Sequence, residues 1–123
     1  MAFLTGKVKL LAYKDSAETE FPKQKIVDED FDFEDLTVTA AQPCYVALAA
    51  LGSVTISFTG LGTVNTAYII SDSQNITVNL NGLGNLTLRA GIPCLIPATL
   101  TSMVVTNASA STATNVEVVL ISG

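Results

Sequence analysis

Residues 76–88, with the sequence ITVNLNGLGNLTL, decide the fold class of this chain. From Ile76 to Leu80, apolar and polar residues alternate strictly. A period of two is typical of a β-strand that buries one face and exposes the other. Gly82 and Gly84 interrupt the alternation, and an extended pattern resumes after them, as expected for a turn between two strands. The stretch therefore predicts a β-hairpin.

The same alternation recurs at residues 54–59. At residues 116–121, Val116, Val118 and Leu120 share one face, and Val119 and Ile121 on the other suggest a strand buried on both sides. No stretch after residue 36 combines a sustained period of 3.6 residues with helix-capping residues. We read the longest apolar run, CYVALAAL at residues 44–51, as strand and loop. The sequence therefore predicts an all-β protein. We expect a β-sandwich or jelly-roll-like single domain of about eight short strands over residues 36–123.

Charged residues are scarce and unevenly distributed. They make up 14% of the 123 residues, against about 25% in an average soluble domain. Residues 1–35 contain five of the six basic residues and nine of the eleven acidic ones. The chain thus divides into a charged N-terminal arm, residues 1–35, and a nearly neutral body, residues 36–123. A net charge of −5 argues against a nucleic-acid partner, and no apolar run is long enough for a transmembrane helix.

The arm ends in the acidic run VDEDFDFEDL, residues 27–36. In an extended strand, the even-numbered positions from 28 to 34 place four carboxylates on one face, while Phe31 and Phe33 lie on the other. We interpret the arm as a strand-forming segment that docks on a neighbouring subunit, with polar groups for orientation and the phenylalanines as anchors. The predicted partner-binding residues are Lys7, Lys9, Asp28, Asp30, Phe31, Asp32, Phe33 and Glu34.

A metal site in the acidic run is the weaker interpretation. Calcium takes six to eight oxygen ligands from a loop that wraps the ion, whereas a straight strand presents its carboxylates in a line. The glycine that allows a calcium loop to turn sharply is missing from the run. We therefore predict neither a metal ion nor a cofactor.

Two stretches of the body resemble each other at an offset of fifty residues: AAQPCYV at 40–46 and AGIPCLI at 90–96. The similarity extends on both sides, so the body is predicted to contain two duplicated halves, residues 36–71 and 86–122, joined by a hairpin-like segment. Proline favours the first residue of a strand or an edge strand because it lacks a backbone N–H. The repeated Pro-Cys step is therefore expected to mark the start of equivalent strands.

The two cysteines, Cys44 and Cys94, admit three interpretations. Buried free thiols fit small apolar side chains that follow the first residue of a strand. A disulfide requires the two Cα atoms to lie within about 7 Å. A metal or redox role would use the only soft ligands in the chain, and it is the weakest of the three. We expect free thiols.

No feature of the sequence points to catalysis. The chain contains no histidine, which removes the usual general base and every histidine-containing triad. The nucleophile motif G-x-S-x-G and the phosphate-binding P-loop motif do not occur. The two GLG triplets, at residues 60–62 and 82–84, are read as turns. We predict that the protein is not an enzyme.

The stretches NITVNLNGLGNLTLRAG, residues 75–91, and IPATLTSMVVTNASASTATNVEVVLISG, residues 96–123, resemble small all-β virion proteins of tailed bacteriophages. That class decorates capsids, forms head fibres or contributes to tails. The resemblance implies a trimeric jelly roll or sandwich bound to the major capsid protein. It also implies a location in the virion, after assembly in the host cytoplasm.

The expected function is therefore that of a capsid decoration or cement protein, a homo-oligomer that binds the major capsid protein through its arm. A neutral body rich in Thr, Ser and Asn also favours assembly, because it has few charges to prevent association. The alternative is a carbohydrate- or receptor-binding module of a fibre or tail. Such a site needs exposed aromatic side chains, and we expect Tyr45, Phe58 and Tyr68 to be buried.

Overall fold

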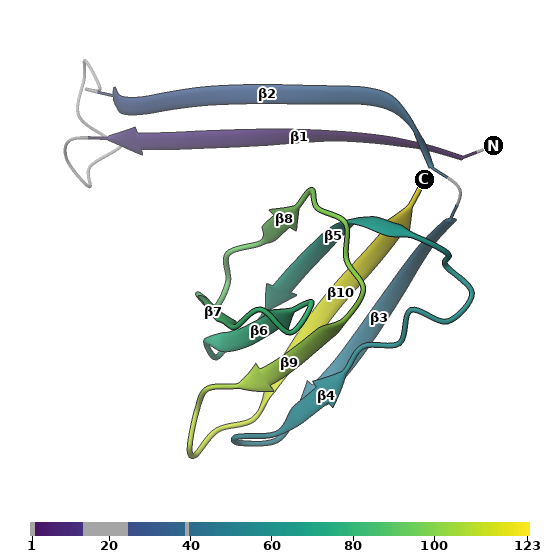
Figure 1. Ribbon diagram of the computed structural model, residues 1–123. Helices are drawn as coiled ribbons and strands as arrows, with labels where there is room; N and C mark the ends of the chain where they lie inside the picture. The colour runs from purple at the N-terminus through teal and green to yellow at the C-terminus, as the bar shows by residue number, and fades with distance from the viewer. Residues whose placement is uncertain (1, 14–24, 39) are drawn as a thin grey trace. The chain divides into compact units, whose positions relative to one another are not determined.

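The computed structural model describes residues 2–13, 25–38 and 40–123 (Figure 1). Every regular element in these residues is a β-strand, which confirms the all-β prediction. The chain divides into two compact units, Met1–Thr37 and Val38–Gly123. No described residue belongs to a helix that could span a membrane.

The first unit contains two long strands, β1 (Ala2–Tyr13) and β2 (Lys25–Val38). They form a two-stranded sheet, and among the described strands they pair only with each other. We call this pair the ribbon. The first unit ends at Thr37, whereas the predicted arm ends at residue 35. Strand β2 continues through residues 36–38.

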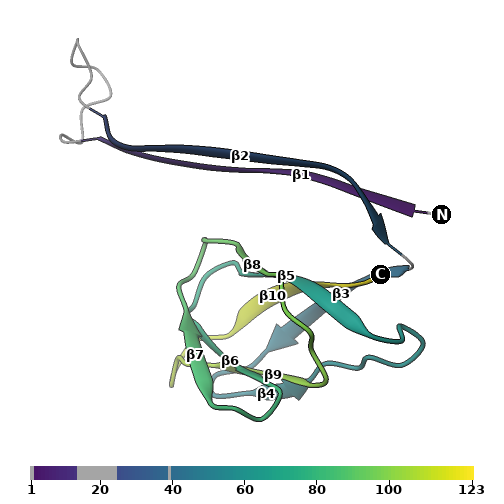
Figure 2. The ribbon, with the colours of Figure 1, turned by 45° about the horizontal axis from the view of Figure 1, so that its top comes forward.

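The second unit is a β-sandwich of eight strands, which confirms the predicted fold (Figure 2). Figure 2 shows its two four-stranded sheets as separate layers. The strands are β3 (Ala40–Leu48), β4 (Ser53–Thr55), β5 (Val64–Ser71), β6 (Ile76–Leu80), β7 (Asn85–Leu88), β8 (Cys94–Ile96), β9 (Met103–Asn107) and β10 (Thr114–Ser122).

The strand order is that of a jelly roll. One sheet has the order β3-β10-β5-β8 and the other has the order β4-β9-β6-β7. Four antiparallel pairs enclose one another in the sequence, as in a single long hairpin. From the innermost to the outermost they are β6·β7, β5·β8, β4·β9 and β3·β10. Pairing of β10 with β5 and of β6 with β9 rolls this hairpin into two sheets. The closed double layer lets each strand bury one side.

The hairpin predicted from residues 76–88 is formed by β6 and β7. Asn81, Gly82 and Gly84 at its tip have positive φ angles of 56°, 70° and 124°. Glycine adopts this backbone region without steric cost, and asparagine tolerates it better than most residues. The Asn81 side chain also accepts a hydrogen bond of 2.7 Å from the backbone N–H of Thr101, which ties the tip to the segment before β9.

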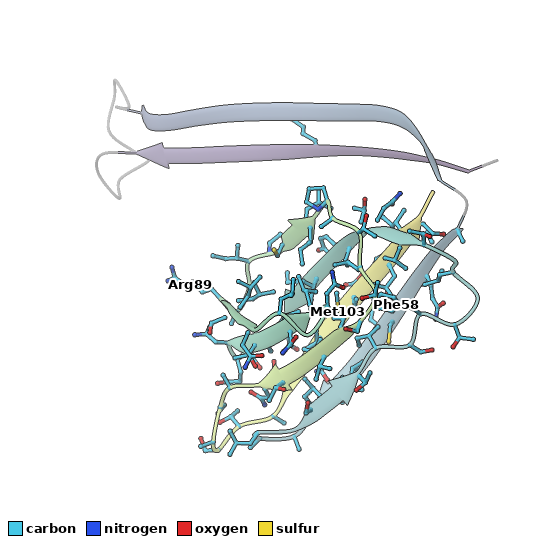
Figure 3. The ribbon with its side chains drawn as sticks, viewed as in Figure 1. Phe58, Arg89 and Met103 are labelled. Carbon is cyan, nitrogen blue, oxygen red and sulfur yellow. The ribbon has the colours of Figure 1, made fainter. Side chains whose placement is uncertain are left out.

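The core lies between the two sheets and is almost entirely aliphatic. Alternate residues of the central strands point inward, as the sequence period predicts. Figure 3 labels Met103, which is completely buried. Each such side chain contributes about 1.5–3 kcal/mol of burial free energy. The largest fully buried apolar side chains are Ile69, Ile76, Met103, Leu120, Val64, Val78, Val105 and Val118.

The two cysteines lie at opposite edges of one sheet. Cys44 on β3 is opposite Val118, Val118 is opposite Ile69, and Ile69 is opposite Cys94 on β8. Three interstrand spacings, about 14 Å, therefore separate Cys44 from Cys94, twice the separation that a disulfide allows. Both thiols are free, as expected, and they pack against the core. They are half-buried rather than buried.

The Pro-Cys repeat does not mark the start of both strands. Pro93 directly precedes β8, as predicted, but Pro43 lies inside β3 rather than at its start. Both strands are edges of the same sheet, where a missing N–H is tolerated. If the two halves were duplicates, β3 would correspond to β8 and β5 to β10. These strands occupy equivalent places in this sheet: β3 and β8 are its two edges, and β10 and β5 are its two central strands. The duplication of the two halves stays a prediction.

Candidate functional site

The predicted partner-binding residues all belong to the ribbon. Lys7 lies on β1, and its side chain is exposed. Lys9 also belongs to β1, and the other predicted residues belong to β2. The predicted roles of these residues stay predictions. The side chains that lie outside the described residues are those of Lys9, Asp28, Asp30, Phe31, Asp32, Phe33 and Glu34.

The outer surface of the β3-β10-β5-β8 sheet is largely apolar. Pro43 is opposite Val119, Val119 is opposite Tyr68, and Tyr68 is opposite Leu95, so one uncharged row crosses all four strands. In the next row, Tyr45 and Ile70 flank Glu117. We call this surface the apolar face. Its members are Pro43, Tyr45, Tyr68, Ile70, Leu95 and Val119.

The outer surface of the other sheet is polar and uncharged. Ser53, Thr106, Thr77 and Thr87 form one row across its four strands. The next row contains two asparagines, a threonine and a single valine. We call this surface the polar face. The two sheets share one core, yet they present different chemistry to the outside.

Tyr45 is the most exposed aromatic side chain in residues 40–123, with 74% of its surface accessible. The prediction that it is buried is therefore wrong, whereas Phe58 and Tyr68 are half-buried. The alternation of β3 explains the exposure, because Cys44 and Val46 point toward the core and Tyr45 between them points outward. This exposure could have been predicted from the sequence, because Cys44 was expected to point into the core and the next residue of a strand points to the opposite face.

A depression of about 560 Å³ lies at one end of the apolar face. It is formed where β3, the end of β5 and the beginning of β10 meet. The depression contains the only two acidic residues that follow residue 35 in the sequence, Asp72 and Glu117. Its lining residues are Tyr45, Val46, Ala47, Ile70, Asp72, Asn115, Val116 and Glu117.

The Asp72 carboxylate is held in place by three donors. Its Oδ1 atom accepts hydrogen bonds from the Asn115 backbone N–H at 3.0 Å and from the Thr114 hydroxyl at 2.9 Å. Its Oδ2 atom accepts one from Nδ2 of Asn115 at 3.2 Å. These bonds, that from the Asn115 backbone foremost, lower the pKa of Asp72 from 3.8 to about 2. Donors stabilise the ionised form, so the carboxylate stays charged at any ordinary pH.

The depressed pKa makes a pH-dependent contribution to stability. Because the folded state lowers the pKa of Asp72, this contribution is complete above pH 3.8 and is lost as the pH falls through about 2. We expect the difference in free energy of unfolding between the wild type and Asp72→Asn to be constant above pH 5 and to change between about pH 4 and 2. Urea unfolding at a series of pH values measures it. A carboxyl titration midpoint near 3.8 in the folded protein would contradict this expectation.

Glu117 differs from Asp72 in having no hydrogen-bond partner among the described residues. Its side chain makes no hydrogen bond or ion pair with the residues that the structure describes. Arg89, the one basic residue after residue 35, follows β7 on the other sheet, and Figure 3 shows it projecting outward there. Within the described residues no three metal-ligating side chains form a group. The depression can therefore accept hydrogen bonds and attract a positive charge.

Comparison with known proteins adds no family: no protein-family model and no curated protein matches this chain.

Proposed function

We propose that the protein is a non-enzymatic structural subunit of a phage virion, a capsid decoration or cement protein. In this proposal it binds the major capsid protein through residues 1–35. The observation that carries the proposal is the division into a sandwich that is complete without the ribbon and a ribbon that pairs only with itself among the described strands. A two-stranded ribbon is marginally stable in water by itself. A segment of this kind gains order by lying on a partner.

The body supports the proposal through its surface. Residues 40–123 contain two acidic residues and one basic residue, so electrostatic repulsion between copies is small. We propose a homotrimer located in the virion, assembled in the host cytoplasm.

The proposal is tested by removing the arm. The full-length chain should co-sediment with empty capsids of its phage, and a chain that begins at residue 36 should stay in the supernatant. Because, among the described strands, those of the sandwich pair only with one another, the truncated chain should keep its thermal unfolding transition, which serves as the control for folding. Native mass spectrometry of both chains reports the oligomer. Equal capsid binding by the folded truncated chain would refute the assignment of the arm.

A carbohydrate- or receptor-binding module of a fibre or tail is the second candidate. The specific observation in its favour is the exposed ring of Tyr45 beside a depression with two carboxylates, since sugar sites stack their ligands on aromatic rings. A glycan panel probed with the wild type and with Tyr45→Ser tests it. Binding that the substitution abolishes would support this candidate.

A further inference from the structure

The two outer surfaces of the sandwich differ in a way that stability does not require. The central row of the polar face is Ser53–Thr106–Thr77–Thr87. The matching row of the apolar face is Pro43–Val119–Tyr68–Leu95. Hydroxyl groups suit a surface that stays in water, whereas a continuous apolar row marks a surface that another molecule covers. The apolar face therefore has the composition of a partner-binding surface.

The edges of this sheet limit how a partner can bind. Pro43 lies within the edge strand β3 and offers no backbone N–H, and the opposite edge strand β8 has only three residues. Addition of a further strand needs a continuous row of free donors and acceptors along an edge. Binding on the face is therefore favoured over strand addition at either edge.

The negative charges at the apolar face indicate which sign of charge a partner should carry. Glu117 lies within the apolar face, and Asp72 lies at its end in the same depression. The single basic residue of the body, Arg89, belongs to a segment next to the other sheet. A region with two negative charges and no compensating cation within residues 40–123 favours a cationic group and repels an anionic one.

The hydrogen-bonding groups of the depression also limit which ligand groups it can bind. A carboxylate has about four lone-pair sites. Hydrogen bonds from Thr114 and Asn115 occupy at least three of those on Asp72, whereas Glu117 accepts no hydrogen bond from the described residues. The Asn115 amide already donates to Asp72. The depression thus offers acceptors and the exposed ring of Tyr45 but few donors. Lysine and arginine carry only donors and bind both carboxylates and aromatic rings, whereas a sugar needs donors as well as acceptors.

We propose that the apolar face is a docking surface for a segment of a partner protein that combines apolar side chains with a lysine or arginine. The apolar side chains cover the row from Pro43 to Leu95. The basic side chain enters the depression, lies against Tyr45 and pairs with Glu117 and Asp72. This contact is separate from the proposed capsid contact of the arm, so the two proposals can fail independently.

The experiment uses the isotope-labelled full-length protein and a short capped peptide of alternating leucine and lysine. We expect the peptide to shift the backbone amide signals of Tyr45, Ile70 and Glu117, and to do so less at higher salt. Glu117→Gln should weaken binding roughly threefold to tenfold, and Tyr45→Ser should weaken it by a similar factor. Thr77→Ala on the polar face is the matched control and should bind like the wild type.

Folding is checked in every variant by thermal unfolding, which should not change for an exposed residue such as Tyr45. Five results would overturn the proposal, and the first four concern the peptide and sugar titrations. They are an absence of shifts at millimolar lysine peptide, equal shifts with the matching glutamate peptide, shifts confined to the polar face, and shifts of the same amides by a neutral sugar but not by the lysine peptide. A concentration-dependent shift of these amides without peptide, together with a doubled mass, would also overturn it, because a second copy would then cover the face.

Discussion

Replacing Ile69 by alanine should lower the free energy of unfolding by about 3–4 kcal/mol. Ile69 is completely buried in the central strand β5 and lies between Val118 and Cys94 in one row of the sheet. The truncation removes three carbon atoms and leaves a cavity between two close-packed sheets. Since domains of this size are stable by about 5–15 kcal/mol, the loss is large. Urea unfolding of the wild type and the variant measures it.

The adjacent residue supplies the matched control. Ile70 is on the same strand but points toward the apolar face and is half-buried. Ile70→Ala removes the same atoms from a partly hydrated site and should cost only about 1 kcal/mol. Equal losses for the two variants would mean that the inward and outward assignments of β5 are wrong, and with them the register of the β3-β10-β5-β8 sheet.

Replacing Asn107 by alanine should lower the free energy of unfolding by about 2–3 kcal/mol. Its completely buried amide Nδ2 donates to the carbonyl oxygens of Ala49 at 3.1 Å and Thr112 at 2.8 Å. Its Oδ1 atom accepts a hydrogen bond from the Ser109 N–H at 3.0 Å. One side chain therefore joins the β3–β4 loop to the β9–β10 loop. Alanine removes the Asn107 partner of the Thr112 carbonyl and the Ser109 N–H, whereas the Ala49 carbonyl keeps the hydrogen bond from the Gly52 N–H. Unpaired buried groups are costly.

Asn85 on β7 is the control for this substitution. Its side chain is exposed and makes no hydrogen bond with the described residues. Asn85→Ala should change the free energy of unfolding by about 0.5 kcal/mol or less. Guanidinium or urea unfolding distinguishes the two variants. A small effect at Asn107 would show that water replaces its hydrogen bonds and that the two loops are held by other contacts.

The charged residues of the sandwich are not part of its core. The sandwich is stabilised by aliphatic burial between its sheets, and no buried side-chain polar atom of the described residues lacks a hydrogen-bond partner. Its few charged groups are therefore not needed for the core. In our proposal Glu117 contacts a partner, whereas Asp72 also fixes the beginning of β10.

The sequence by itself determined the strands, the turn at the tip of the β6–β7 hairpin and the separation of charge between arm and body. These features are local: a period of two, glycines that tolerate positive φ, and the position of ionisable groups along the chain can each be read from neighbouring residues. The free state of the cysteines also agreed with a sequence expectation, although the reason was found only in the sheet. Cys44 and Cys94 occupy the same row at opposite edges.

Only the tertiary structure decided which strands pair and what the outer surfaces carry. Backbone hydrogen bonds between strands are nearly independent of sequence, so the pairing of β3 with β10 depends on the burial of distant residues against one another. The depression follows from that pairing, because Tyr45, Asp72 and Glu117 come from three separate segments. An alternating pattern states that one side of each strand is buried. It does not state which neighbours the other side will have, and those neighbours turn three scattered residues into a candidate binding surface.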